Sequence, residues 1–413
     1  MIVGGGFGGL SAARALRGAP VDVLLLDRRN HHVFQPLLYQ VATAGLSPGD
    51  IASPIRWILR RQSNVRVWLA EVIEVHPDRR VLRLADGAEL EYDYLILAAG
   101  SAHAYFGHDE WSAFAPGLKT LEDALEIRRR VLSAFEDAER ERDPARQRRL
   151  LTFVVIGGGP TGVELAGALA EISRHALAND FRAIAPETAR IILIEAGGAV
   201  LSTYPAPLPA FARKALERLG VAVWTGTPVT GVEDGRVRLG AETIEAGTIL
   251  WAAGVAASPL GQSLGAPLDR AGRVWVNDDL TIPGHPDIAV VGDLAVFKTA
   301  EGSVLPGVAQ VAMQQAAHAA RNVLRTIDGR PREPFVYRDY GNMATIGRNS
   351  AVADFGWLRV KGYVAWLMWL FLHVFKLIGF RNRLSVMTQW AFAYVSYQRS
   401  VRLITHGRMG PPQ

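Results

Sequence analysis

The chain has 413 residues, about half of them apolar, and it contains no cysteine. Beyond about 250–300 residues a single hydrophobic core usually stops growing, so two or three domains are expected. The lack of cysteine excludes disulfides, thiolate metal sites, iron–sulfur clusters and every mechanism that uses a redox-active cysteine pair.

The net charge of +5 is distributed unevenly. No aspartate or glutamate follows Asp354, whereas eight of the 45 lysines and arginines lie beyond residue 356. The first 356 residues therefore carry 37 bases and 40 acids, so a slightly acidic body precedes a wholly basic tail. The start of the chain has no basic segment before an apolar stretch and no A-x-A cleavage site, so we predict no signal peptide and a cytoplasmic body.

The chain opens with MIVGGGFGGL, which predicts a strand of three residues, a glycine turn and a helix over 10–16. The apolar run VDVLLLD then ends at Asp27, and the whole predicts a β-α-β unit. Gly4, Gly6 and Gly9 fit the G-x-G-x-x-G pattern that brings backbone close to a pyrophosphate. A central parallel strand usually has about five or six residues, so we expect a longer natural N-terminus and weak retention of the nucleotide.

The same pattern returns 153 residues later as FVVIGGGPTGVELAGAL, followed by RIILIEAGG. Here Gly157, Gly159 and Gly162 form the glycine pattern, and Glu195 ends the next strand as Asp27 does in the first copy. The repeat distance is too long for a solenoid and right for a duplicated nucleotide-binding domain. Either turn alone would also fit an ordinary glycine turn, but two copies, each with an acid at the following strand end, favour two dinucleotide sites.

The acids at the strand ends suggest which dinucleotides bind. A carboxylate suits the two ribose hydroxyls of adenosine and repels a 2′-phosphate, so Glu195 favours NADH over NADPH. Two such sites in one chain have a direct chemical use if a flavin in the first accepts hydride from a nicotinamide in the second. The later strand DIAVVGDLA ends in Gly292 and Asp293, where the carboxylate can hold the ribityl-phosphate region of a flavin or, equally, cap a helix.

With these motifs the chain resembles the type II NADH dehydrogenases, the single-subunit NADH:quinone oxidoreductases that do not pump protons. The resemblance covers nearly the whole length and includes NHHVFQPLLYQVATAGLSP, GGGPTGVELAGAL, VAQVAMQQAAHAARN, YGNMATIGRNSAV and LIGFRNRLSV. The glycine motifs are shared with many flavoproteins, whereas FQPLLYQVAT and AQVAMQQ are much more specific.

The resemblance implies an α/β fold with two Rossmann-like dinucleotide-binding domains, for FAD and NADH, and a C-terminal amphipathic membrane-binding region. The expected domains are a first FAD-binding segment (1–112), an inserted NADH-binding domain (113–254), a second FAD-binding segment with a quinone-site helix (255–346) and a membrane-association domain (347–413). FAD is the implied cofactor, NADH the co-substrate and a membrane quinone, ubiquinone or menaquinone, the acceptor. No metal site is predicted.

The resemblance also implies roles for individual residues. Glu164, Gln310 and Gln314 are expected to be catalytic. The expected FAD-binding residues are Gly4, Gly6, Phe7, Gly8, Gly9, Asp27, Gln35, Thr43, Ala99, Gly100, Gly292, Asp293, Ala309 and Gln310. The expected NADH-binding residues are Gly157, Gly159, Pro160, Thr161, Gly162, Glu164, Glu195, Ala253 and Gly254.

The three catalytic candidates each have a simpler interpretation. Gln310 and Gln314 stand four apart and share a helix face, which the resemblance puts beside the flavin at the quinone entrance, but which also fits exposed helix glutamines. Gln315 is expected to face elsewhere. Glu164 follows the second glycine turn, where a helix dipole stabilises a carboxylate. The resemblance places it near nicotinamide and flavin, where it could orient a ligand or relay protons to quinone.

The tail contains GYVAWLMWLFLHVF over 362–375, fourteen residues without formal charge. This run is shorter than the roughly 18 residues of a spanning helix. Flanking arginines and lysines, with interleaved tryptophan and tyrosine, predict a pair of amphipathic helices on a lipid bilayer surface over 357–400. A buried core helix or a homodimer surface also fits this tail, but nucleic acid does not, because the apolar run is too continuous. We therefore predict a peripheral protein on the cytoplasmic face of the inner (plasma) membrane.

Other classes of protein share parts of this pattern. Disulfide reductases and sulfide:quinone oxidoreductases share the double-dinucleotide architecture but need cysteines, so they are excluded. An NAD(P)H-dependent ferredoxin or rubredoxin reductase needs none, yet lacks the basic aromatic tail and the AQVAMQQ segment. A non-catalytic NADH-sensing membrane protein is the alternative from another class.

Overall fold

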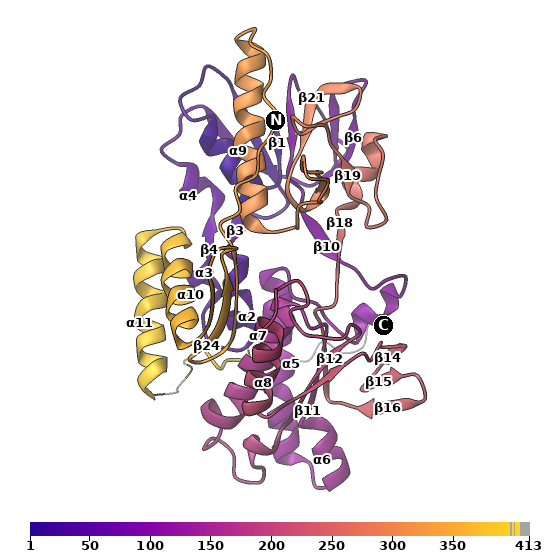
Figure 1. The fold of residues 1–413 in the computed structure, drawn as a ribbon, viewed down its shortest axis with the longest axis vertical. Coiled ribbons are helices and arrows are strands. Elements are labelled where there is room, and N and C mark those ends of the chain that lie inside the picture. The colour runs from indigo at the N-terminus through magenta and orange to yellow at the C-terminus, as the bar shows by residue number, and fades with distance from the viewer. Residues whose placement is uncertain (397–398, 400, 405–413) are drawn as a thin grey trace. The chain divides into compact units, whose positions relative to one another are not determined.

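The structure is a computed structural model that describes residues 1–396, 399 and 401–404. The chain folds into two compact units, and each is assembled from three separate stretches of sequence (Figure 1). Unit 1 comprises Met1–Val33, Ala52–His103 and Val255–Tyr340. Unit 2 comprises Phe34–Ile51, Ala104–Gly254 and Gly341–Gln413. Residues 34–51 and 104–112 thus fold with unit 2, and the division into four domains stays a prediction.

Unit 1 is built around a six-stranded sheet in the order β20-β21-β9-β1-β2-β5. All neighbouring strands are parallel except β20 and β21. The inner strands read as continuous apolar runs because a parallel sheet covered on both faces buries them. The strands are β1 Ile2–Val3, β2 Val23–Asp27, β5 Val65–Leu69, β9 Leu95–Leu97, β20 Thr281–Ile282 and β21 His285–Val290.

Strand β1 is central although it has only two residues. Ile2 stands in register with Leu25 on one side and Ile96 on the other. The ladder continues beyond the strand, because the amide of Gly4 donates to the Leu26 carbonyl at 2.8 Å. The short apolar start of the sequence therefore leads directly from the middle of the sheet into the glycine turn.

The other elements of unit 1 cover this sheet. Helix α1 (Phe7–Ala15) packs against α9 (Ala309–Ile327), and α4 (Ile55–Leu59) precedes β5. A buried core that includes Leu26, Leu82 and Leu97 joins the central sheet to the sheet β6-β7-β8. The remaining strands are β3 His31–Val33, β4 Ala52–Pro54, β6 Val72–His76, β7 Val81–Leu84, β8 Glu89–Glu91, β10 Ser101–His103, β18 Val255–Ala257, β19 Val274–Trp275 and β22 Ala295–Val296.

Unit 2 contains a second central sheet, with four parallel strands in the order β13-β12-β11-β17. These are β11 Thr152–Ile156, β12 Arg190–Glu195, β13 Val221–Thr225 and β17 Thr248–Trp251. A three-stranded antiparallel sheet, β14 Gly231–Glu233, β15 Arg236–Leu239 and β16 Glu242–Glu245, shares a core with it. The helices are α2 Leu38–Ala42, α3 Pro48–Ile51, α5 Leu121–Arg140, α6 Pro144–Leu150, α7 Pro160–Glu171 and α8 Leu208–Arg218.

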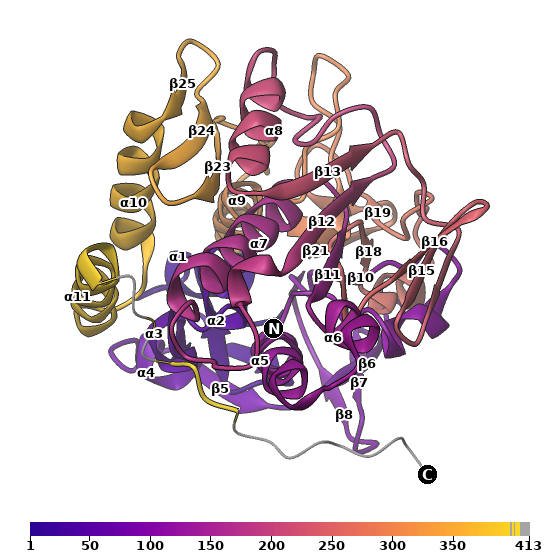
Figure 2. The same ribbon diagram turned by 90° about the horizontal axis from the view of Figure 1, so that it is seen from below.

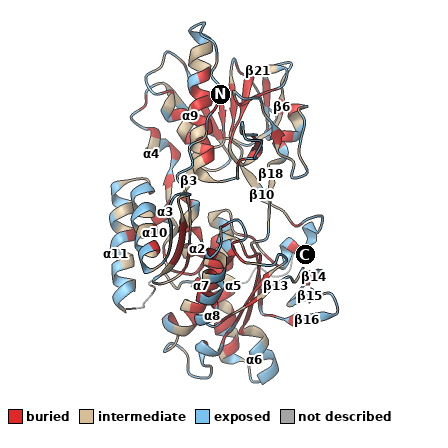
Figure 3. Cartoon of the chain, viewed as in Figure 1, coloured by how far each residue is buried: buried red, intermediate tan, exposed pale blue. Residues whose placement is uncertain are grey.

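The tail belongs to unit 2 and begins with the antiparallel strands β23 Asn342–Gly347, β24 Ser350–Asp354 and β25 Arg359–Gly362. Two helices follow, α10 Tyr363–Lys376 and α11 Phe380–Ser396, and α10 lies against these strands (Figure 2). Both helices carry many exposed residues, whereas the strands of the two parallel sheets are largely buried (Figure 3). Among the described residues, no helix combines the length and the apolar character needed to cross a membrane.

Candidate functional site

The first glycine turn links β1 to α1 in unit 1, and its shape depends on two glycines. Gly4 has a φ of +100°, and a Cβ there would lie 2.3 Å from the Ala98 carbonyl oxygen. A Cβ on Gly9 would lie 1.7 Å from the Gly4 oxygen, so any side chain at either position breaks the turn. A Cβ on Gly6 meets nothing within 4 Å, which leaves the backbone open to a ligand at the start of α1.

Asp27 ends β2 beside this turn. Its Oδ2 accepts a hydrogen bond from the Gly5 amide at 2.5 Å, and its Oδ1 accepts one from the Arg29 amide at 2.6 Å. Each carboxylate oxygen has a further lone pair, so the group can still accept from a ribose hydroxyl. The carboxylate thus lies at the carboxyl edge of the sheet, where α/β folds bind nucleotides.

The second turn, in unit 2, repeats this geometry closely. Gly157 has a φ of +111°, and a Cβ on Gly162 would lie 1.8 Å from the Gly157 oxygen. A Cβ on Gly159 would again meet nothing within 4 Å. Glu195 takes the place of Asp27, because its oxygens accept from the Gly158 and Gly197 amides, each at 2.6 Å.

The other predicted NADH residues lie around this turn. Pro160 and Thr161 form the start of α7, where proline suits the first helical position. Ala253 and Gly254 follow β17, and a Cβ on Gly157 would touch the Ala253 Cα at 2.6 Å. Ala253 is therefore in direct contact with the glycine turn.

The remaining predicted FAD residues of unit 1 lie on neighbouring strand ends. Ala99 and Gly100 follow β9, and Asp293 follows β21, where its Oδ2 accepts from the Ser101 hydroxyl at 2.6 Å. Helix α9 begins at Ala309, and Val308 occupies its N-cap position. On α1, the Phe7 ring meets the His32 ring edge-on, and a Cβ on Gly8 would lie 3.3 Å from that of Ala98.

Gln310 and Gln314 hold the segment 330–340, which we call the strap. The Gln314 side chain donates to the Arg338 carbonyl at 2.9 Å and accepts from the Arg338 amide at 3.1 Å. Gln310 accepts from the Tyr340 amide at 3.3 Å. Gln315 faces another way, because its Oε1 accepts from the Gly292 amide at 2.7 Å.

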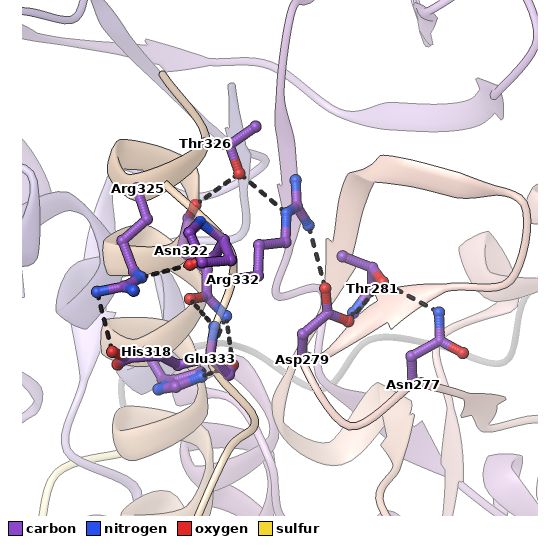
Figure 4. Close-up of polar contacts among 10 residues, drawn as sticks. Asn277, Asp279, Thr281, His318, Asn322, Arg325, Thr326, Arg332 and Glu333 are labelled. Atoms are coloured by element: carbon purple, nitrogen blue, oxygen red, sulfur yellow. Dashed lines mark hydrogen bonds and ion pairs between the residues drawn. The ribbon is translucent and has the colours of Figure 1, made fainter. Parts of the chain in front are cut away.

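The same helix anchors the other end of the strap (Figure 4). The Asn322 amide donates to the Glu333 carbonyl at 2.8 Å and accepts from the Glu333 amide at 3.0 Å. Arg325 pairs with the Glu333 carboxylate at 2.9 Å, and Arg332 lies 3.5 Å from Asp279. Amide side chains on α9 therefore hydrogen-bond the strap backbone at both of its ends, Gln310 and Gln314 near residues 338–340 and the buried Asn322 at Glu333.

Unit 2 contains a cavity of about 1130 Å³. Its walls come from α2, α7, the turn between β23 and β24, and the two tail helices, and apolar and aromatic side chains predominate on the tail side. Polar side chains gather on the other walls, among them Tyr39, Gln40, Thr43, Glu164, Glu171, Arg348 and Arg399. Glu164 and Thr43 thus line one cavity within unit 2, whereas Gln310 and Gln314 belong to unit 1. Gln35 also lies in unit 2, where its side-chain amide is 3.4 Å from the Lys119 carbonyl.

Glu164 is the most perturbed acid of this cavity. Burial disfavours the charged carboxylate and raises its pKa from 4.5 to about 8, against a weak opposing hydrogen bond from the Thr345 amide at 3.4 Å. The side chain therefore holds a proton at neutral pH. Because it lines the cavity, that proton can be given to a molecule bound there.

A hydrogen-bonded chain joins the tail helix α11 to α2 in the cavity wall. The Trp390 indole donates to the Gln40 oxygen at 2.7 Å, and the Gln40 amide donates to the Tyr39 hydroxyl at 3.0 Å. Burial, and then the nearby Glu164, raise the pKa of Tyr39 well above 10, so the phenol keeps its proton. Since its oxygen already accepts from Gln40, the Tyr39 hydroxyl is oriented to donate.

Arg399 lines the cavity and links the end of α2 to α7. It donates to the Thr43 carbonyl at 2.7 Å and pairs with Glu171 of α7 at 3.1 Å. The Thr43 hydroxyl bonds the Tyr39 carbonyl at 2.9 Å, so this predicted FAD residue uses its side chain within α2. A buried charge needs such partners to be tolerated.

Several of these residues were not predicted. Glu171 lies just beyond the GGGPTGVELAGAL motif, and Arg348 lies within YGNMATIGRNSAV without an assigned role. Arg399 was counted only among the cations of the basic tail. Tyr39 and Gln40 lie in FQPLLYQVAT, between the predicted FAD residues Gln35 and Thr43, and had no assigned role. Gln315 is adjacent to the predicted pair and differs from them only by its helix face.

The chain was compared with known proteins. The family model described as pyridine nucleotide-disulphide oxidoreductase matches residues 1–316, and the model of the NDH2 C-terminal domain matches residues 340–402. Two curated relatives from Mycobacterium tuberculosis, the type II NADH:quinone oxidoreductases Ndh and NdhA, are each 46% identical. Both alignments cover 98% of this chain, with 90% of Ndh and 89% of NdhA.

A solved structure of NDH2 from Plasmodium falciparum, titled as a complex with NADH, shares the fold of the chain. It superposes with a TM-score of 0.88 at 20% identity and covers 98% of this chain and 99% of that one. The absence of cysteine shows that membership in a disulphide oxidoreductase family here concerns the fold and not disulfide chemistry.

Proposed function

The chain belongs to the type II NADH:quinone oxidoreductase family, and we propose that it passes electrons from NADH through FAD to a membrane quinone without pumping protons. This membership confirms the predicted family and fold class. The observation that carries the proposal is the pair of matching glycine turns in one chain that also holds a large, mostly apolar cavity with a protonated acid in its wall.

The residues of both turns fit the dinucleotides assigned to them. In unit 1 the open face of Gly6 and the carboxylate of Asp27 would receive the pyrophosphate and ribose of FAD, with Asp293 toward its ribityl-phosphate region. In unit 2 Gly159 and Glu195 would do the same for NADH. Bound FAD would supply a ring that accepts hydride from nicotinamide and passes two electrons on.

The protein itself supplies placement and protons. Reduction of a quinone to a quinol takes two protons with the two electrons, and Glu164 holds one at neutral pH. We assign the unit 2 cavity to the quinone, with Tyr39 and Glu164 as polar groups near its oxygens. We also propose that Gln310 and Gln314, which hold the strap in unit 1, lie beside the flavin at the quinone entrance.

We propose that the tail docks the protein on a bilayer. Phe371, Phe375 and Phe380 are 75%, 59% and 80% exposed, and Lys376 and Arg381 stand next to them. Aromatic rings and basic residues together favour the headgroup region of an anionic leaflet. The predicted span 357–400 includes positions 397, 398 and 400, which lie outside the described residues.

We also propose a membrane face, a dimer surface and a domain division for the protein. The protein would lie on the cytoplasmic face of the inner (plasma) membrane, where NADH is made available, and the same exposed helices offer a surface for a homodimer. The division into 1–112, 113–254, 255–346 and 347–413 is proposed as the functional organisation, with the NADH-binding part inserted between the two FAD-binding segments.

The test is steady-state oxidation of NADH by the flavin-loaded protein with ubiquinone and menaquinone analogues, and with a ferredoxin as the competing acceptor. NADH should bleach the flavin absorbance and added quinone should restore it. A colourless purified chain would favour the NADH-sensing alternative, and restoration by ferredoxin alone would favour a ferredoxin reductase.

A further inference from the structure

Phe106 is a backbone outlier in the loop that follows β10. Its φ is +53°, in the left-handed region that residues with a Cβ rarely adopt, and it is followed by Gly107 with a φ of +90°. The ring is nevertheless 68% exposed. Strain at a residue that buries little apolar surface indicates a role other than folding, because such conformations cost of order 1–3 kcal/mol.

The ring lies against a residue of the proposed NADH site. An ideal Cβ on Gly254 would stand 2.5 Å from the Phe106 Cζ, so the absence of a side chain at Gly254 is what admits the ring. The Trp251 ring supports Phe106 from β17, with ring centroids 6.2 Å apart. The loop is fixed on both sides, since the Ala104 amide donates to the Gly254 carbonyl at 3.2 Å and the Trp251 indole donates to the Ala104 carbonyl at 2.9 Å.

The strand order shows which part of the dinucleotide this place would hold. Strand β11 carries the glycine turn, with β12 on one side and β17 on the other, so the crevice of the sheet lies between β11 and β17. Glu195 at the end of β12 marks the adenosine side. The nicotinamide half must then extend over the end of β17, where Ala253 and Gly254 lie.

We propose that Phe106 forms an aromatic wall for the nicotinamide half of NADH and that it contributes to the affinity for this half only. The inference rests on the proposed function. An exposed ring that packs against Trp251 offers a surface for the planar nicotinamide or for the apolar side of its ribose. Positions 252–254 are alanine, alanine and glycine, so no large side chain follows β17 beside the ring.

The experiment compares two ligands on the full-length flavin-loaded protein by calorimetry. NAD⁺ contains the nicotinamide nucleotide, and ADP-ribose lacks the nicotinamide ring while keeping the adenosine and pyrophosphate. Phe106→Ala should weaken NAD⁺ binding roughly three- to tenfold, the range expected for one aromatic contact, and leave ADP-ribose binding within twofold. Phe106→Tyr should restore NAD⁺ affinity.

Two further variants separate a ligand contact from a structural role. Phe106→Gly removes the ring and also relieves the positive φ, so it should raise the thermal midpoint while NAD⁺ affinity falls as in the alanine variant. Gly254→Ala should displace the ring and reproduce the loss, and should cause no further loss when combined with Phe106→Ala. Phe114→Ala, at a phenylalanine of the same unit that is 36% exposed, is the control and should change neither affinity.

Equal weakening of NAD⁺ and ADP-ribose in Phe106→Ala, or no weakening of either, would overturn the aromatic wall. A wild-type protein that binds FAD but neither nucleotide would instead overturn the proposed function. The two failures are thus distinguished in one set of titrations.

Discussion

Replacing Glu164 with glutamine removes a buried ionisation and keeps the size of the side chain. Glu164 lies on α7 in the cavity wall and receives one weak hydrogen bond, from the Thr345 amide at 3.4 Å. Burial raises its pKa from 4.5 to about 8, so the neutral acid is the form that the fold accommodates. Glutamine resembles that neutral form at every pH.

The sign of the pH dependence follows from proton binding. Between pH 4.5 and 8 the folded protein holds the Glu164 proton and the unfolded chain has released it, so a rise in pH favours unfolding. The difference of about 3.5 pH units corresponds to at most about 5 kcal/mol above pH 8, and solvent in the cavity lowers this limit. The variant should match the wild type near pH 4.5 and exceed its stability by a few kcal/mol above pH 8.

Urea unfolding of flavin-loaded protein, followed by tryptophan fluorescence at pH 5, 6.5, 8 and 9, measures this difference directly. Glu187→Gln, at an exposed acid of the same unit, is the matched control and should show no trend. A Glu164→Gln stability difference that is the same at pH 5 and pH 9 would refute the reasoning. In turnover, the variant should slow quinone reduction by about 10²-fold or more and leave ferricyanide reduction, which needs no proton, unchanged.

Three further predictions concern the nucleotide sites and the tail. Gly9→Ala should prevent flavin-loaded protein from forming, because its Cβ would lie 1.7 Å from the Gly4 oxygen. Gly6→Ala should leave the urea midpoint of the apoprotein unchanged and should lower only the ratio of flavin to protein absorbance, because a Cβ there meets nothing within 4 Å. Glu195→Gln should reduce the kcat/KM ratio of NADH over NADPH about tenfold, and an unchanged ratio would count against its ribose contact. The double variant Phe371→Ser and Phe375→Ser should bind anionic vesicles more weakly in cosedimentation and reduce long-tailed quinone more slowly, but should still reduce a soluble dye. Undiminished cosedimentation would show that these two side chains do not contribute to membrane binding.

The sequence by itself determined the two nucleotide turns. Gly4 and Gly9 are five residues apart, and Gly157 and Gly162 repeat the spacing, so the contact that forces glycine is local and shows in the pattern. The tail helices could also be predicted, because a long apolar run and the basic residues beside it are visible in the sequence. The structure separates α10 from α11 at residues 377–379, a segment that contains Gly379 and follows Lys376.

Only the tertiary structure decided which distant residues share a site. Tyr39, Glu164 and Trp390 are far apart along the chain and meet in one cavity, and their hydrogen bonds and the pKa of Glu164 arise from that burial. In the same way Gln310 and Gln314 have a recognisable spacing, yet their partners on the strap come from residues 24 to 30 positions later. A motif records contacts made within a few residues, whereas burial and long-range hydrogen bonds depend on how the elements pack, and no local pattern carries that information.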